Sequence, residues 1–199
     1  MEKQLIISLS RQFGGGGHTI GNKLAEHYGI PLYDRDLLKM IASEKDLDAA
    51  ELERYDEKPR NLLFSRSVHG YSNSPEDNIV QMQFDYLKKK AASGESFIII
   101  GRCSEDVLKE YSGLISFFIL GDREDRIRHT MEREALSYED AEKLMESKDK
   151  RRKAYHNHYC KSKWGDSRNY DLSINSSRLG MEESGDFLID YIDRMLAKR

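Results

Sequence analysis

The sequence has few of the residues that mark secreted or membrane-spanning proteins. Only two cysteines occur among 199 residues, Cys103 and Cys160. They are too few for a disulfide framework and predict a reducing, cytoplasmic setting. No apolar run approaches the roughly 20 residues that span a bilayer, and MEKQLIISLS is too short for a signal peptide. We therefore expect no membrane association.

A strong charge of one sign is also lacking. The net charge is −3 although 34% of the residues are charged, so no overall field favours nucleic acid. The sequence does not indicate an oligomeric state. The length predicts a single domain over 1–199 that is able to bury a substantial core.

Five short apolar runs predict β-strands. They cover residues 4–9, 30–34, 97–101, 114–120 and 171–175. Three of them are almost continuous in Ile, Leu and Phe, which is typical of strands in a sheet covered on both faces. Amphipathic helical patterns separate the runs, and this alternation predicts an α/β fold with a mainly parallel sheet.

The helical signals differ in strength. Ser74-Pro75-Glu76-Asp77 supplies an N-cap, a proline at the first helical position and acids in the first turn. Residues 122–160 predict one or two highly charged helices, and 181–196 predict another helix. Residues 35–93 are too long for a single crossover between strands, so we expect a mobile, substrate-covering insertion there.

Four consecutive glycines follow the first predicted strand and precede a predicted helix. They are Gly14, Gly15, Gly16 and Gly17. Helix N-termini bind anions, and glycines allow successive amides to face one phosphate. A tight strand-to-helix turn is the simpler alternative, although four glycines exceed what a turn needs.

Two nucleotide chemistries compete for this loop. A dinucleotide fingerprint would use Gly14 and Gly16, with Asp34 as the downstream acid, but Thr19 occupies the place of its third glycine. A phosphoryl-transfer loop fits the spacing and Thr19, but His18 stands where a lysine is expected. The loop alone does not decide between them.

The downstream cations favour phosphoryl transfer. Arg102 follows the third predicted strand, and three further arginines lie in the charged helical region: Arg126, Arg151 and Arg152. Phosphoryl transfer relies on such cations because its catalysis is mostly positioning and electrostatic stabilisation. The alternatives are an ion pair of Arg102 with Glu105 or Asp106, and a solvated face for the helical arginines. Asp34 could bind Mg²⁺, accept a proton, or cap the helix that follows.

The chain resembles the cytidylate kinase-like family of P-loop nucleoside monophosphate kinases over nearly its whole length. The segments that carry the resemblance are ISLSRQFGGGGHTIGNKLAEHYGIPLYDRDLL, FIIIGRCSEDVL, DREDRIRHTMER and DKRRKAYHNHYCKSKWGDSRNYDLSINSSRLG. The resemblance implies a three-layer α/β/α sandwich of the P-loop kinase type with a five-stranded, mainly parallel sheet. It also implies an acceptor-binding insertion at 35–93 and a lid region at 136–168.

The resemblance also implies site residues and cofactors. Gly14 to Gly17 with His18 and Thr19 would hold the phosphates of ATP, and Thr19 and Asp34 would provide oxygen ligands for Mg²⁺. Asp34, Arg102 and Asp171 would face the acceptor. Arg151 and Arg152 would close on the transferred phosphoryl group, with Asp149 orienting them.

The missing lysine is the departure from the family pattern. Arg11 precedes the loop and could reach over it, so we expect Arg11 to replace the lysine. The leading hypothesis is a Mg²⁺-dependent kinase that transfers the γ-phosphate of ATP to CMP, dCMP or a related small acceptor. The alternatives are a nucleotide-binding regulator with weak or no catalysis and a dinucleotide-dependent oxidoreductase.

Overall fold

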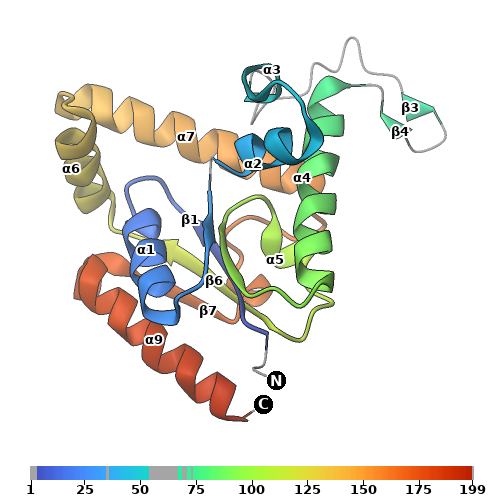
Figure 1. Ribbon diagram of the computed structural model, residues 1–199. Helices are drawn as coiled ribbons and strands as arrows, with labels where there is room; N and C mark the ends of the chain where they lie inside the picture. The colour runs from blue at the N-terminus through green and yellow to red at the C-terminus, as the bar shows by residue number, and fades with distance from the viewer. Residues whose placement is uncertain (1–3, 35, 54–66, 69–70, 73, 199) are drawn as a thin grey trace.

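A five-stranded parallel sheet forms the centre of the protein (Figure 1). The computed structural model describes residues 4–34, 36–53, 67–68, 71–72 and 74–198. The strands are β1 (Ile6–Arg11), β2 (Leu32–Tyr33), β5 (Phe97–Ile100), β6 (Leu114–Leu120) and β7 (Leu172–Asn175). Their order is β2-β5-β1-β6-β7, and every pairing is parallel. All five predicted strands are thus confirmed.

Helices cover both faces of the sheet, which confirms the three-layer sandwich (Figure 1). Ile7 and Leu9 point to one face, where α1 (Gly17–Tyr28) and α9 (Met181–Lys198) pack on them. Ile6 points to the other face, towards α2 (Leu37–Lys45), α4 (Pro75–Ala92) and α5 (Ser104–Val107). This alternation follows from the two-residue period of a strand.

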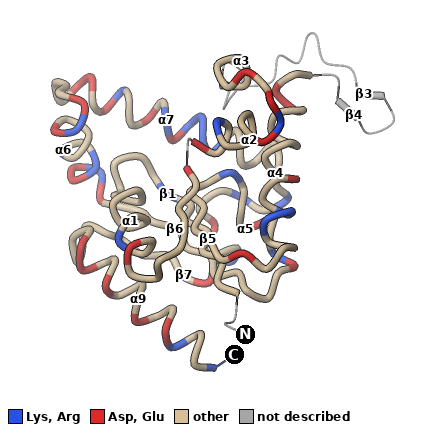
Figure 2. The backbone as a smooth tube through the Cα atoms, viewed as in Figure 1, with Lys and Arg blue, Asp and Glu red and all other residues tan. Residues whose placement is uncertain are grey.

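The charged region predicted over 122–160 forms two helices, α6 (Arg123–Glu134) and α7 (Tyr138–Tyr159). Figure 2 shows acidic and basic residues along both. Their inner faces enclose a separate small core in which Ile127, Ala141 and Met145 surround Phe13. This core brings α6 and α7 against the segment that follows β1. No helix in the described part of the chain is long and apolar enough to span a membrane.

The segment between β2 and β5 has structure of its own. It contains α2, α3 (Ala49–Glu53), the antiparallel pair β3 (Ser67–Val68) and β4 (Tyr71–Ser72), and α4. Part of the expected insertion, residues 54–66, lies outside the described residues. The predicted start of α4 is confirmed, since the Ser74 hydroxyl accepts a hydrogen bond from the Asp77 amide. The short helices η1 (Ser167–Asn169) and α8 (Ser176–Leu179) flank β7.

The core beside β1 should be sensitive to truncation. Ile7 is fully buried at the centre of the sheet, and Ile7→Ala should lower the free energy of unfolding by about 2–5 kcal/mol because it leaves a cavity. Urea denaturation measures this loss. Leu47→Ala is the control, because Leu47 is exposed; equal losses in the two variants would contradict the assigned core.

Candidate functional site

The glycine loop joins the carboxyl end of β1 to the start of α1. Gly14 and Gly16 have φ of 78° and 80°, the left-handed region that favours glycine. A Cβ atom would also collide at both positions, with the Arg126 backbone at Gly14 and with the Met181 side chain at Gly16. No side chain caps α1, so the loop presents a helix N-terminus suited to an anion.

A buried ion pair attaches the loop to α6 and α7. The Arg126 guanidinium pairs with the Asp149 carboxylate, and its Nε donates to the Phe13 carbonyl at 2.8 Å. Asp149 Oδ1 accepts from the Phe13 amide at 2.7 Å. Both polar groups of the Phe13 backbone are therefore bonded to this pair. Asp149 was expected to orient Arg151 and Arg152; these contacts show it holding the loop and Arg126.

Two further arginines flank the Phe13 ring. The guanidinium carbon of Arg133 lies 4.6 Å from the ring centroid, and that of Arg152 lies 5.3 Å from it. Such cation–π contacts hold the charges beside the loop. His129 adds a contact, with its Nδ1 3.2 Å from the Gly14 carbonyl oxygen.

Arg11 crosses the start of α1. Its aliphatic atoms occupy the space that a Cβ of Gly17 would need, and its guanidinium lies against Gly101. Arg11 Nη2 is 3.5 Å from Asp34 Oδ1, and His18 Nδ1 is 3.3 Å from Asp34 Oδ2. Asp34 thus links the residue at the expected lysine position to Arg11. The alternative role of Asp34 as a helix cap is not observed, because α2 begins at Leu37 with Asp36 at its N-cap.

Two cavities meet at this end of the sheet. The larger, of about 1210 Å³, is lined by Gly14, Gly16, Gly17, His18, Thr19 and Asp34 among others. The smaller is lined by residues that include Arg102, Tyr155, His156 and Trp164. Arg11 and Arg152 line both. The structure therefore brings the loop, Asp34, Arg102 and Arg152 into one region.

Two of the expected site residues lie elsewhere. Arg151 is exposed and lines neither cavity. Asp171 precedes β7, at the amino end of that strand, and its carboxylate accepts from the amide and hydroxyl of Ser116 at 2.7 and 2.9 Å. The carboxyl ends of the strands, where the glycine loop lies, are at the opposite edge of the sheet.

The two cysteines are buried and contact each other. A hydrogen bond to Cys160, together with burial, raises the pKa of Cys103 well above its usual range. For Cys160, the hydrogen bond from Cys103 outweighs burial and, with the help of His156, lowers the pKa to about 7. Cys103 is 2% exposed and packs as a small residue of the core.

Over the residues that the structure describes, no group of three or more His, Cys, Asp or Glu could hold a metal ion, so His156 and Cys160 do not form such a centre. Thr19, in the first turn of α1, and Asp34 both line the larger cavity. They are oxygen ligands of the kind that Mg²⁺ accepts, together with water and phosphate oxygens.

Several contributors were not identified from the sequence: Phe13, His129, Arg133 and Met181 line the larger cavity. The first three could have been suspected, since Phe13 precedes the glycines and the other two lie in DREDRIRHTMER, a segment that carries the family resemblance. No local signal marks Met181, which reaches Gly16 only through the packing of α9.

The loop attachment predicts a stability effect. Asp149→Asn should lower the free energy of unfolding by about 3–5 kcal/mol, because it leaves the buried Arg126 charge without its counterion. Chemical denaturation measures this loss, and amide hydrogen exchange at Phe13 should accelerate. Asp190→Asn, which breaks an exposed pair with Arg194, is the matched control. An equally small effect for both variants would contradict the attachment.

Comparisons with known proteins place these features in a family. The family model "Cytidylate kinase-like family" matches residues 6–178. A cytidylate kinase of Pyrococcus horikoshii is 28% identical over 181 residues, covering 90% of this chain and 83% of the relative. A cytidylate kinase of Halobacterium salinarum is 23% identical over 197 residues, covering 98% and 93%.

Solved structures show the same architecture. An uncharacterized protein from Eubacterium ventriosum has a TM-score of 0.76 and 39% identity, with 96% of this chain and 99% of that chain covered. A shikimate kinase from Bacteroides thetaiotaomicron has a TM-score of 0.56 and 14% identity, with 95% and 98% covered, and supports the fold. The five-stranded parallel sheet, the glycine loop at its carboxyl edge and the family match over most of the sequence agree: this chain belongs to the cytidylate kinase-like family.

Proposed function

We propose that the protein is a phosphotransferase that moves the γ-phosphate of ATP to CMP, dCMP or a related small anionic acceptor. One observation carries the proposal. Arg11 and Arg152 line both the cavity with the glycine loop and the cavity with Arg102. Two cations shared by neighbouring cavities can stabilise charge on a group that passes from one cavity to the other.

The larger cavity suits the donor. The uncapped amides at the start of α1 face phosphate oxygens, and Gly14 and Gly16 keep side chains away from them. Thr19 and Asp34 would hold Mg²⁺, which when bound neutralises charge on the phosphates. Arg11 would supply the permanent charge that His18 lacks: its aliphatic atoms lie beside Gly17, and its guanidinium lies against Gly101 and 3.5 Å from Asp34.

The smaller cavity, of about 30 Å³, suits the phosphate group of the acceptor and is too small for a whole nucleoside monophosphate. Arg102 follows the carboxyl end of β5 and is 6% exposed, and Arg152 belongs to α7. Both line the cavity. In this proposal the 35–93 segment covers the acceptor, and the 136–168 region, which contains α7, acts as the lid. Asp34 orients Arg11 and His18. The nucleophile would be an oxygen of the acceptor phosphate, which has no hydroxyl proton to lose, so the transfer needs no general base.

A second candidate is a nucleotide-binding regulator with little or no catalysis. The observation that favours it is the position of His18, whose imidazole contacts Asp34. Histidine lacks the long stem and the compact ammonium group of lysine, so it is a weaker phosphate contact. Binding of ATP without turnover is the behaviour expected of such a protein.

A coupled assay separates the candidates. Purified protein, ATP, Mg²⁺ and a panel of nucleoside monophosphates are combined, and ADP formation is measured. We expect turnover with CMP or dCMP. ATP binding without turnover on any acceptor would support the regulator, and tight NADH binding without ATP binding would exclude both candidates in favour of an oxidoreductase.

The role of Arg11 has its own test. Arg11→Ala should weaken ATP binding at least about tenfold, because a charge-assisted contact to phosphate is lost. Isothermal titration calorimetry measures the dissociation constant. Adding His18→Lys to this variant should recover part of the loss by placing a cation at the usual position. An unchanged affinity in Arg11→Ala would remove Arg11 from the site.

A further inference from the structure

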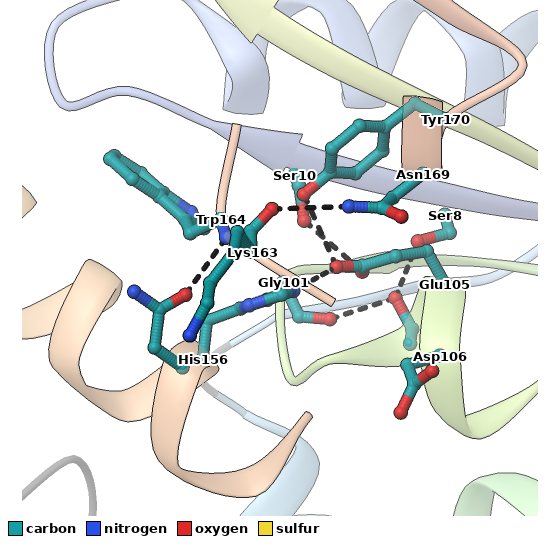
Figure 3. A network of polar contacts seen from close by, with 12 residues as sticks. Ser8, Ser10, Gly101, Glu105, Asp106, His156, Lys163, Trp164, Asn169 and Tyr170 are labelled. Carbon is teal, nitrogen blue, oxygen red and sulfur yellow. Dashed lines mark hydrogen bonds and ion pairs between the residues drawn. The ribbon is translucent and has the colours of Figure 1, made fainter. Parts of the chain in front are cut away.

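A buried carboxylate is hydrogen-bonded to two residues that line the smaller cavity, Ser10 and His156 (Figure 3). The Glu105 side chain is 2% exposed and accepts hydrogen bonds from three donors. His156 Nε2 is 2.5 Å from Oε1, the Tyr170 hydroxyl is 3.3 Å from the same oxygen, and the Ser10 hydroxyl is 3.2 Å from Oε2. The donors come from α7, from the segment before β7, and from β1. Glu105 therefore joins three parts of the fold at one point.

Glu105 and His156 form an ion pair. Burial opposes a charge on His156, but the neighbouring Cys160 and Glu105 outweigh it and raise the pKa of His156 to about 10. Nε2 faces the Glu105 carboxylate, whereas Nδ1 has no hydrogen-bond partner among the described residues.

Stability alone is a poor reason for such a pair. Removing two charges from water costs several kcal/mol for each ion, roughly the amount that their attraction returns. An apolar pair of similar volume would fill the same space without that cost. A buried ion pair does, however, define one geometry, because a slip of α7 along the sheet would leave two charges unpaired.

The sequence spacing connects this geometry to the cavity. Arg102 precedes Glu105 by three residues in the turn into α5, and Arg152 precedes His156 by one turn of α7. Residues four apart lie on the same face of a helix. The two arginines line one cavity. Each has one residue of the ion pair three or four positions later in the chain, Glu105 in α5 and His156 in α7.

We propose that Glu105 and His156 are positioning residues, whose ion pair sets the separation of Arg102 and Arg152 so that both guanidinium groups bind one phosphate group. The catalytic meaning of this arrangement rests on the proposed function, in which that phosphate belongs to the acceptor. The binding itself does not depend on turnover and can be measured separately.

Trp164 provides the readout. It is the single tryptophan of the sequence and lines the same cavity. Its ring packs edge-on against Phe118, with 5.3 Å between the ring centroids. Its fluorescence should change in a saturable way when orthophosphate, the probe, is titrated into the full-length protein. ADP titrated by calorimetry reports on the glycine loop, which the ion pair does not contact in the described interactions.

Four variants test the proposal. Glu105→Gln and His156→Gln should each weaken orthophosphate binding about tenfold and weaken ADP binding by about threefold at most, because Arg152 also lines the larger cavity whereas Arg102 does not. The double variant should recover most of the loss, because two amides can hydrogen-bond to each other. Glu105→Asp keeps both charges but retracts the carboxylate by one methylene, and should also weaken orthophosphate binding.

The control is Tyr28→Phe, which removes a hydroxyl hydrogen-bonded to Asp193 at the far end of α1 and should leave both affinities unchanged. Thermal midpoints are measured for all variants. If Glu105→Gln or His156→Gln does not fold, Glu105→Asp and the double variant carry the test. Variants that lose stability yet bind orthophosphate as the wild type does would overturn the proposal, as would a wild type without saturable orthophosphate binding. If the affinities change as expected but no acceptor is phosphorylated, the positioning role stands and the kinase function fails.

Discussion

Strand β1 lies in the middle of a parallel sheet, hydrogen-bonded to β5 on one side and to β6 on the other, and the site is built around its carboxyl end. Because parallel strands end at the same edge, β1 brings Arg11 and the glycine loop beside Gly101 and Arg102, which follow β5. After β1 the chain continues into α1 on one face of the sheet, and after β5 it continues into α5 on the other face. This divergence opens the crevice in which sheets of this type bind ligands. The glycine loop, the arginines and Asp34 all depend on this strand order.

The edge is rich in cations, and acids hold those cations in place. Asp149 pairs with Arg126, Asp34 with Arg11, and Glu105 with His156. Each pair joins elements that are distant in the sequence. The acids fix the positions of the positive groups, so a protein with a net charge of −3 still presents arginines in a defined arrangement at this end of the sheet. Local charge, and not the overall balance, decides what this edge can bind.

The fold was largely predictable from the sequence because strands and helices leave periodic patterns. The apolar runs identified every strand of the central sheet, and Ser74-Pro75 located the start of α4. The site was predicted less completely. Glycine spacing located the loop, and the arginine after β5 was found through its place at a strand end. The contact of Asp149 with Phe13 and Arg126 could not be foreseen, since a run of charged helical residues does not show which of them turn inward.

The sequence by itself determined the order of strands and helices, the glycine loop and the family, because these depend on local patterns and on motifs of contiguous residues. Only the tertiary structure decided which charges meet. It placed Arg152 beside Arg11 and left Arg151 exposed, although the two arginines are neighbours in the chain. It also set Asp171 at the far edge of the sheet. The physical reason is that successive side chains of a helix point about 100° apart. The packing of α7 on the loop therefore turns Arg152 towards the site and Arg151 towards solvent.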